Sequence, residues 1–466
     1  MTACLPSLTR KEANKKVPES YVNSAQDSIS TIQDTTNTGR LNWKTFFTDP
    51  YLVSLIDTAL KNNQALNIIL QDINIAKNEV RSRKGNYLPF LGISGGAGLD
   101  RQGRYTRLGA LDANNNIVPG QANPSTLPDY MLTANVSWQV DIWKQLRNSK
   151  KAAVFNYLST IEGKNFMVTQ LVSEIAFAYY ELMALDNQLD IIKANIEIQK
   201  NALNIVTLQK TAGQVTELAV LRFQAEVRKN QSRQYYIQQR IIETQNNINF
   251  LVGRFPQLPE RNSQSFNTLA PDSIYKGIPS QILENRPDIR QAELTLASTK
   301  LDVKVAKANF YPVLNITAGI GYEAFNPSYF LTTPQSTLFY LAGGLAAPLI
   351  NRNGIKATYL SANARQVQAA YDYERTILRA YTEVANQQAN ISNLANSYNF
   401  KAQQVDAMNR SINIAINLFK SARADYVEVL FTQRDALESR MELIEIRKQR
   451  LNARVKMYQV LGGGWK

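Results

Sequence analysis

The sequence predicts a mixed α and β fold that is mainly helical and consists of two copies of one unit. Three observations predict it. Residues 50–252 are loosely repeated by residues 278–462. Each copy contains a pair of short segments with alternating apolar and polar residues, as is typical of β-strands. Each copy also contains a helix-forming run longer than a globular core needs. We therefore expect each copy to run helix, strand, strand, long helix and shorter helix.

The repeat is visible in three matched blocks. Residues 59–66 match residues 282–289, residues 86–91 match residues 309–314, and residues 251–253 match residues 460–462. These matches divide the chain into four parts: an extended N-terminal segment at 1–49, a first repeat at 50–252, a linker at 253–286 that packs on the outside, and a second repeat at 287–466.

A single helix is expected over residues 50–86. Asp49 is a suitable N-cap, and Pro50 suits the first helical position. The helix stops before Leu88-Pro89, because the residue before a proline avoids the helical conformation. A short helix is expected over residues 287–309 in the second copy.

Two strands are expected in each copy, at 88–100 and 130–141, and at 311–323 and 338–348. In the second of them Leu132, Ala134, Val136, Trp138 and Val140 form one face, and Thr133, Asn135, Ser137, Gln139 and Asp141 form the other. This pattern fits a strand half-buried on a soluble core. It equally fits a membrane strand with one face toward lipid and one toward a lumen. On the second interpretation Trp138 and Trp143 lie at the membrane interface. The polar residues 100–129 are expected to form a long loop.

Long helices follow the strand pairs, at about 144–209 and 355–420. Neither run contains Pro, and Gly163 is their only Gly. Helices of this length are about 100 Å long. In both helices a stripe of mostly apolar residues recurs at spacings of three and four, which indicates either a coiled coil or plain antiparallel packing. The stripes are Leu182, Leu185, Leu189, Ile192, Ile196, Gln199, Leu203 and Val206, and Ile391, Leu394, Tyr398, Lys401, Val405, Met408, Ile412 and Ala415.

Each long helix ends at a short turn, at 211–216 and 420–425, and a helix about half as long follows, at 217–251 and 426–461. The first turn has no charged residue, whereas the second contains Lys420, Arg423 and Asp425. This asymmetry predicts that any charged constriction at the helical tips comes from the second copy.

Composition excludes several functions. The chain has no His and one Cys, which removes His-based acid/base catalysis, Ser-His-Asp catalysis and the common zinc sites. No phosphate loop or dinucleotide motif is present, so we expect neither an enzyme nor a cofactor. The net charge of +14 suits nucleic acid or an anionic membrane surface. Because no run of five or six like charges occurs, solvated faces explain most of it, and no nucleic-acid partner is expected.

The number of strands points to assembly. Four strands cannot form a closed barrel, which needs about eight. A four-stranded sheet leaves two unpaired edges, and in lipid those edges must be paired. Three chains would supply twelve strands around a lumen, and the long helices would continue the tube.

Three stretches resemble a known family: Ile278–Glu293 with its Glu-Asn-Arg-Pro-Asp-Ile core, Ser137–Trp143, and Leu461–Trp465. The chain resembles the TolC-type outer-membrane efflux proteins, in the branch attached by an N-terminal lipid. The resemblance implies a homotrimer, a 12-stranded outer-membrane β-barrel with four strands per chain, and a 12-helix coiled-coil tunnel across the periplasm. It also implies a passive exit channel for drugs or other toxic compounds. The implied partners are a periplasmic adaptor, an inner-membrane transporter of the proton-driven RND type, and outer-membrane lipid.

The resemblance implies particular site residues. Arg423, Asp425 and Glu428 match the family's periplasmic gate, where ionic links and a ring of carboxylates close the tip. One carboxylate per chain becomes three close like charges in a trimer, which favours cations. The alternative is that these are ordinary charges near a helix turn, with Asp425 as a cap. The turn residues Gly213 and Ala422 would lie where the adaptor docks.

Cys4 follows Thr2-Ala3, which resembles the end of a lipoprotein cleavage site, so lipid attachment at Cys4 is expected. The alternative is an inert cysteine.

Basic residues flank the expected strands. We hypothesise that they form a collar at the level of anionic lipid head groups, although ordinary solvated helix ends explain the same residues. They are Arg81, Arg83, Lys84, Lys144, Arg147, Lys150, Lys151, Lys304, Lys307, Arg352 and Lys356.

Two other functions remain open. One is the outer-membrane duct of a type I protein secretion system, which has the same architecture. The other is a non-membrane scaffold whose coiled coils bind proteins. The transported substrate is not readable from the sequence.

Overall fold

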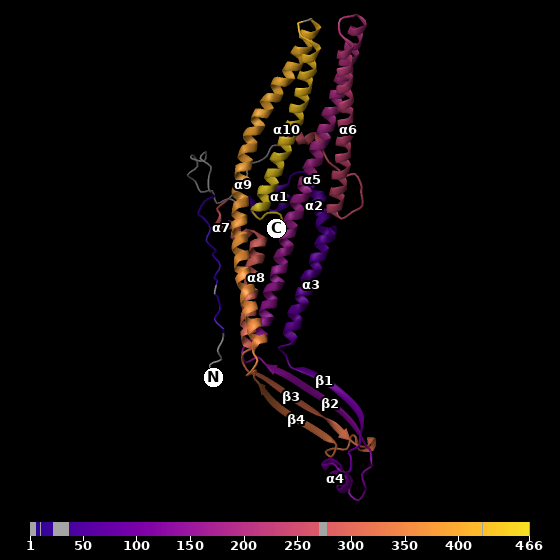
Figure 1. The fold of residues 1–466 in the computed structure, drawn as a ribbon, viewed down its shortest axis with the longest axis vertical. Helices are drawn as coiled ribbons and strands as arrows, with labels where there is room; N and C mark the ends of the chain where they lie inside the picture. Colours follow the sequence, from indigo (N-terminus) through magenta and orange to yellow (C-terminus); the bar gives the residue numbers. More distant parts are fainter. Residues whose placement is uncertain (1–5, 10, 22–36, 270–276, 422, 466) are drawn as a thin grey trace. The chain divides into compact units, whose positions relative to one another are not determined.

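The computed structural model describes residues 6–9, 11–21, 37–269, 277–421 and 423–465. The chain divides into two compact units (Figure 1). The first unit comprises residues 1–12, 74–158 and 294–370, and the second comprises residues 13–73, 159–293 and 371–466. The mainly helical fold with one small sheet agrees with the prediction.

The first unit contains the sheet. Its strands are β1 (Phe90–Asp100), β2 (Leu127–Val140), β3 (Val313–Ala324) and β4 (Thr337–Ala346), and they pair antiparallel in the order β1-β2-β3-β4. All four lie side by side in Figure 1. The connection between β1 and β2 was expected to be a loop, and here the prediction is wrong. It contains α4 (Arg107–Asn114), because the Thr106 hydroxyl accepts a hydrogen bond from the Gly109 amide at 3.1 Å and caps the helix.

The strand register gives the sheet one apolar and one polar face. Neighbours across the ladders share a face, so Ile93, Ala134, Ile320 and Phe339 form one apolar row. Rows on either side extend this face with Leu91, Val136, Ala318 and Leu341, with Trp138 and Ile316, and with Leu314 and Leu345. The opposite face has hydrogen bonds that link Ser94 to Thr133 at 2.9 Å, Asn135 to Ser94 at 2.7 Å and Tyr340 to Asn135 at 3.1 Å.

The apolar face of the sheet is exposed in the single chain. Ile93, Phe339 and Leu341 have 79%, 82% and 78% of their surface accessible. The sheet order also leaves β1 and β4 with a strand partner on one side only. A face this apolar requires a cover, and edges this long require partners.

No described helix combines the length and the apolar character that crossing a membrane would need.

Helix ends surround the base of the sheet in the first unit. They belong to α3 (Gln64–Gly85), α5 (Gln145–Thr211), α8 (Pro287–Ala308) and α9 (Asn353–Lys420). Ala306 and Phe310 of the α8 end pack against Tyr359 and Ala362 of α9. Asp141 precedes α5 and stabilises its first turn, because its buried carboxylate accepts hydrogen bonds from the amides of Leu146 and Arg147 at 2.9 and 3.0 Å.

The second unit contains the main core. It includes η1 (Thr38–Arg40), α1 (Trp43–Phe46), α2 (Pro50–Asn62), α6 (Glu217–Val252), η2 (Ser263–Asn267), α7 (Ser280–Asn285) and α10 (Tyr426–Val460). Residues 1–49 were expected to be extended, and this is wrong for their last part. Trp43, Phe46 and Phe47 are buried, and Phe46 stacks on Tyr458 with ring centroids 4.0 Å apart.

The helix expected over 50–86 is divided into α2 and α3 at Asn63, so that prediction is wrong. Asn63 has an extended ψ of 123°, its side chain accepts the Leu66 amide at 2.9 Å, and it donates to the Leu251 carbonyl at 2.8 Å. The matched residue Arg286 separates α7 from α8 and donates to the Val460 carbonyl at 3.0 Å. At both breaks, therefore, a side chain donates a hydrogen bond to a backbone carbonyl at the end of a returning helix.

Two glycines permit these contacts. Gly253 and Gly462 follow α6 and α10 with φ of 80° and 87°, a conformation that suits glycine. A Cβ at Gly253 would lie 2.5 Å from the Asn62 carbonyl oxygen, and one at Gly462 would lie 2.6 Å from that of Asn285. The matched blocks at 251–253 and 460–462 thus correspond to two close backbone approaches.

Each long helix packs against a shorter returning helix. Gln199 of α5 is the one polar residue in the first stripe. It is buried and accepts a hydrogen bond from buried Asn230 of α6 at 2.8 Å. Of the other stripe residues in α5, Leu182, Leu185, Ile192, Ile196 and Val206 are buried. The α9 stripe is more open, since only Val405 and Ala415 are buried.

Candidate functional site

The tip between α9 and α10 contains the residues predicted to form a gate. Asp425 is the N-cap residue of α10 by position, yet its side chain makes no capping hydrogen bond. Arg423, Asp425 and Glu428 are all exposed. Among the described residues none of the three side chains has an ion-pair or hydrogen-bond partner. The alternative role of Asp425 as a side-chain cap is therefore absent from this structure.

The tip between α5 and α6 differs in its charges. Lys210 and Glu217 flank the turn and form an ion pair with each other. Gly213 is exposed, has a φ of 73°, and has no atom within 4 Å of the place a Cβ would occupy. The Lys210–Glu217 pair was missed in the sequence because both residues lie just outside the matched turn. The charged residues at the α5–α6 tip therefore pair with each other, whereas, among the described residues, Arg423, Asp425 and Glu428 at the α9–α10 tip do not.

Apolar residues join the two tips within the second unit. Val206, Ala219 and Phe223 of the α5–α6 tip are buried together, and Phe419, Tyr426 and Leu430 of the other tip pack against them. The contact leaves the three charged side chains of the second tip available for a partner.

Trp138 and Trp143 lie near the end of β2. The half-buried Trp138 donates its indole N–H to the Tyr87 carbonyl at 3.2 Å. The Trp143 ring stacks on Tyr311 with centroids 4.7 Å apart, and its indole N–H donates to the Pro312 carbonyl at 2.7 Å. The two tryptophans therefore hold together the segments that enter and leave the sheet.

Two predicted site residues, Cys4 and Ala422, lie outside the described residues. The described part of the chain contains no group of three or more Cys, Asp or Glu residues arranged to hold a metal ion.

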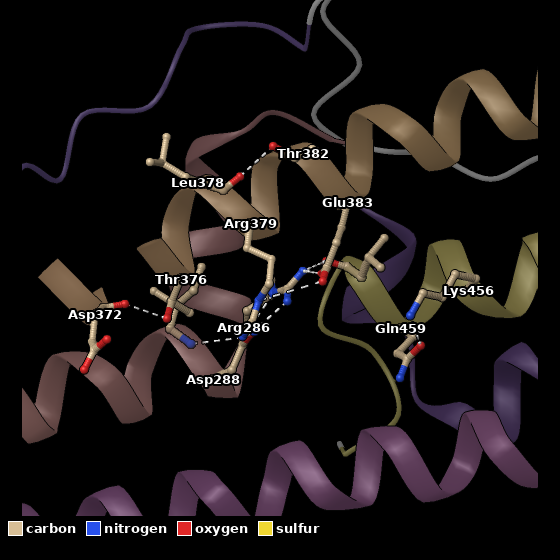
Figure 2. Close-up of polar contacts among 12 residues, drawn as sticks. Arg286, Asp288, Asp372, Thr376, Leu378, Arg379, Thr382, Glu383, Lys456 and Gln459 are labelled. Atoms are coloured by element: carbon tan, nitrogen blue, oxygen red, sulfur yellow. Dashed lines mark hydrogen bonds and ion pairs between the residues drawn. The ribbon is translucent and has the colours of Figure 1, made fainter. Parts of the chain in front are cut away.

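A buried ionic cluster surrounds Arg286 in the second unit (Figure 2). Its guanidinium donates to both oxygens of Asp288, at 3.0 and 2.8 Å, and to Glu383 at 2.8 Å. Only 6% of the Arg286 side chain is exposed. Burial lowers the pKa of this guanidinium, but the hydrogen bonds and charges of Asp288 and Glu383 raise it by more, so the group stays charged.

Arg379 and Lys456 border the same cluster, beside a pocket of about 220 Å³. Arg379 is 58% exposed and lies 3.8 Å from Asp288 and 3.9 Å from Glu383. The Arg-Pro-Asp motif was visible in the sequence, but its ion-pair partner Glu383 was not. A charged residue directly before a helix-starting proline was the available signal.

The matches to known proteins extend along most of the chain. The family model described as Outer membrane efflux protein matches residues 55–254 and 278–463. The cation efflux system protein CusC of Escherichia coli O6:H1 is 24% identical over 465 residues, which cover 100% of this chain and 96% of that protein. The solvent efflux pump outer membrane protein SrpC of Pseudomonas putida is 26% identical over 429 residues, 91% of this chain and 87% of that protein. A crystal structure of CusC has the same fold, with a TM-score of 0.84 and 22% identity, covering 98% of this chain and 99% of that chain.

Proposed function

The chain belongs to the outer membrane efflux protein family, and on this premise we propose that it is the exit channel of a tripartite efflux pump. The family places the protein in the bacterial outer membrane. The channel is a passive conduit for small toxic compounds, and its gate is the periplasmic tip of the helices. It performs no chemistry and needs no cofactor.

The observation that supports a channel most directly is the sheet. Its apolar face is exposed along its length, and its two edge strands lack a partner on one side. Lipid covers such a face, and edge strands of neighbouring chains pair in a membrane. We propose that three chains form a 12-stranded barrel whose polar face, with Ser94, Thr133 and Asn135, lines the lumen. A coiled-coil scaffold outside a membrane leaves the apolar face uncovered.

The internal repeat extends the same assembly through the helices. Each copy supplies one long helix and one column of shorter helices, so two copies per chain and three chains give twelve helical columns around one tunnel. The matched breaks at Asn63 and Arg286 and the matched glycines Gly253 and Gly462 support this two-fold organisation within the chain.

The gate is proposed at Arg423, Asp425 and Glu428. The support is that these exposed charges have no partner within the described residues, whereas Lys210 and Glu217 of the first tip pair with each other. In a trimer the charges of the second tip would meet across the axis and hold the tip closed through ionic links. The turns at Gly213 and Ala422 would receive the periplasmic adaptor, which joins the channel to an inner-membrane transporter of the RND type. Lipid on Cys4 would add an anchor.

The transporter, and not this chain, selects the transported substrate. CusC is named for cations and SrpC for solvents, so relatives of one architecture differ in what they export. A protein secretion duct shares the architecture, and neighbouring genes for an adaptor and a transporter would separate the two.

The proposal is tested by conductance. The full-length protein is purified in detergent, its mass is compared with that of three chains, and it is inserted into a planar bilayer. Loss of about 0.5 kcal/mol for each exposed ionic contact, in three chains at once, shifts the closed-to-open equilibrium by roughly tenfold. We therefore expect Asp425→Ala and Arg423→Ala channels to conduct roughly ten times more than the closed wild type.

Matched controls come from the first tip. Gln214→Ala and Thr216→Ala occupy the equivalent positions and should leave the wild-type conductance unchanged. A monomer that does not insert would contradict the channel. A trimeric channel that stays closed in both second-tip variants would contradict only the gate.

A further inference from the structure

The positive charge of this chain is concentrated where helices meet strands. Four segments flank the sheet in the first unit: 74–89, 141–158, 294–312 and 347–370. Together they contain 14 Lys and Arg residues against 3 Asp and Glu residues, a net charge of +11 out of the +14 of the whole chain. If the basic residues were spread evenly over all solvated helix ends, these four segments would not contain most of the net charge.

The three acidic residues in these segments neutralise little of the charge. Glu79 pairs with Arg83 at 2.7 Å, and the buried Asp141 pairs with Arg147 at 3.0 Å. Burial raises the pKa of Asp302, and the charges of Arg365 and Arg83 oppose that shift. Eight other exposed cations have no carboxylate partner among the described residues, and we call them the basic collar: Lys77, Arg81, Lys84, Lys144, Lys151, Lys304, Lys307 and Lys356.

Aromatic contacts connect the collar segments to the apolar face of the sheet. Trp138 belongs to that face, and its indole N–H donates to the Tyr87 carbonyl at 3.2 Å. The guanidinium of Arg147 lies over the Tyr87 ring, 5.9 Å from its centre. The exposed Trp143 stacks on Tyr311 at the same end of the strands. The order from strand to helix is therefore apolar, aromatic and basic.

This order is that of a membrane interface. Tryptophan and tyrosine favour the head-group level, and lysine and arginine just beyond it attract anionic lipid. We propose that the basic collar binds anionic phospholipid head groups of the leaflet that faces the helices. The inference rests on the proposed membrane location of the strands. A collar that lined the lumen would act on anionic solutes instead. However, Trp138 lies on the apolar face of the sheet, and it contacts Tyr87, whose ring lies under Arg147.

The test measures lipid preference. Full-length trimer is inserted into vesicles that contain equal amounts of phosphatidylglycerol and phosphatidylcholine, and the lipids that remain bound after mild extraction are counted by native mass spectrometry. We expect wild type to retain phosphatidylglycerol preferentially. Because one basic side chain at an anionic surface strengthens binding by roughly fivefold, the triple variant Lys304→Gln, Lys307→Gln, Lys356→Gln should lose at least that much of the preference.

Two control proteins make the result specific. The variant with arginine at the same three positions keeps the charge and should keep the preference. The variant Lys61→Gln, Lys193→Gln, Arg233→Gln removes three exposed charges from the second unit and should also keep it.

The outcomes separate the two proposals. A protein that inserts into no vesicle would overturn the membrane channel and the collar together. A protein that inserts and conducts but retains both lipids equally, or whose glutamine variant changes ion selectivity while its lipid preference stays, would overturn the collar alone.

Discussion

Arg286 keeps a full positive charge at a position that water hardly reaches. Desolvating an ion costs several kcal/mol, and only close hydrogen-bonded partners offset the cost. Here the partners are Asp288 on the same helix start, Glu383 on α9 and the Val460 carbonyl at the end of α10. One side chain thus joins three elements that are far apart in the sequence.

We predict that Arg286→Met destabilises the protein by about 3 to 5 kcal/mol, because it leaves two carboxylates without their buried partner. Unfolding in detergent at fixed protein concentration, followed by circular dichroism, measures the loss. Arg379→Met is the matched control in the same cluster. Its side chain is 58% exposed with contacts near 4 Å, so the loss should stay below about 1 kcal/mol. Equal losses in both variants would argue against a buried ionic anchor.

At the scale of elements, the division of α2 from α3 and of α7 from α8 determines how the returning helices end. The chain turns sharply at Asn63 and Arg286, and the backbone just before each turn approaches a glycine that ends α6 or α10. The close approach, more than the left-handed φ alone, makes these two glycines necessary.

Gly253→Ala should destabilise the protein more than Gly213→Ala does. Both positions have a positive φ, for which alanine costs about 1 to 2 kcal/mol. At Gly253 the added Cβ also overlaps the Asn62 carbonyl at 2.5 Å, whereas at Gly213 nothing lies within 4 Å. Overpacking adds about 1 to 3 kcal/mol. Melting temperatures of the two variants in one detergent measure the difference. The prediction fails if the Gly213 variant melts as low as the Gly253 variant.

At the scale of the whole molecule, the main core contains tyrosines whose hydroxyls are held neutral. Burial raises the pKa of Tyr180 to about 12, although the charge of Arg454 opposes it. Burial likewise raises the pKa of Tyr179 and of Tyr458. An unfolded tyrosine ionises near pH 10, so above that pH the unfolded chain loses protons that the folded chain retains. The stability these tyrosines contribute is therefore complete below pH 10 and is lost as the pH rises toward the folded values.

The Tyr180→Phe variant should lose stability less steeply with pH, by about 1.4 kcal/mol per pH unit between roughly pH 10 and 12. Unfolding of wild type and variant at a series of alkaline pH values measures both slopes. Tyr235→Phe, at a position 71% exposed, should have the wild-type slope. Identical slopes in all three proteins would show that Tyr180 is not buried neutral.

Several features were predictable because they are local. Alternation along 131–140 placed Leu132, Val136 and Trp138 on one face, and the strand register agrees. The absence of Pro predicted the two long helices, and six of the eight residues in the α5 stripe of three-and-four spacing are buried. The resemblance to the outer-membrane efflux family is confirmed by the family match. The gate residues, the adaptor turns and the lipid on Cys4 stay predictions.

Other features were not predictable because they depend on contacts between remote residues. Nothing in the local pattern separates Asn63 from a helix interior, since its break is stabilised by a carbonyl 188 residues away. The short helices before residue 50 form where Trp43 and Phe46 reach the core. The helix α4 depends on one capping threonine within a segment that otherwise resembles a loop.

The sequence by itself determined the order of the main elements, the two faces of the strands and the length of the helices, because periodicity and composition act through neighbours along the chain. The family followed from the resemblance of three short stretches. Only the tertiary structure decided where the helices break, which partners surround Arg286, and which tip satisfies its own charges. Those outcomes depend on burial and on charges brought together from distant segments, and no short window of sequence contains both partners.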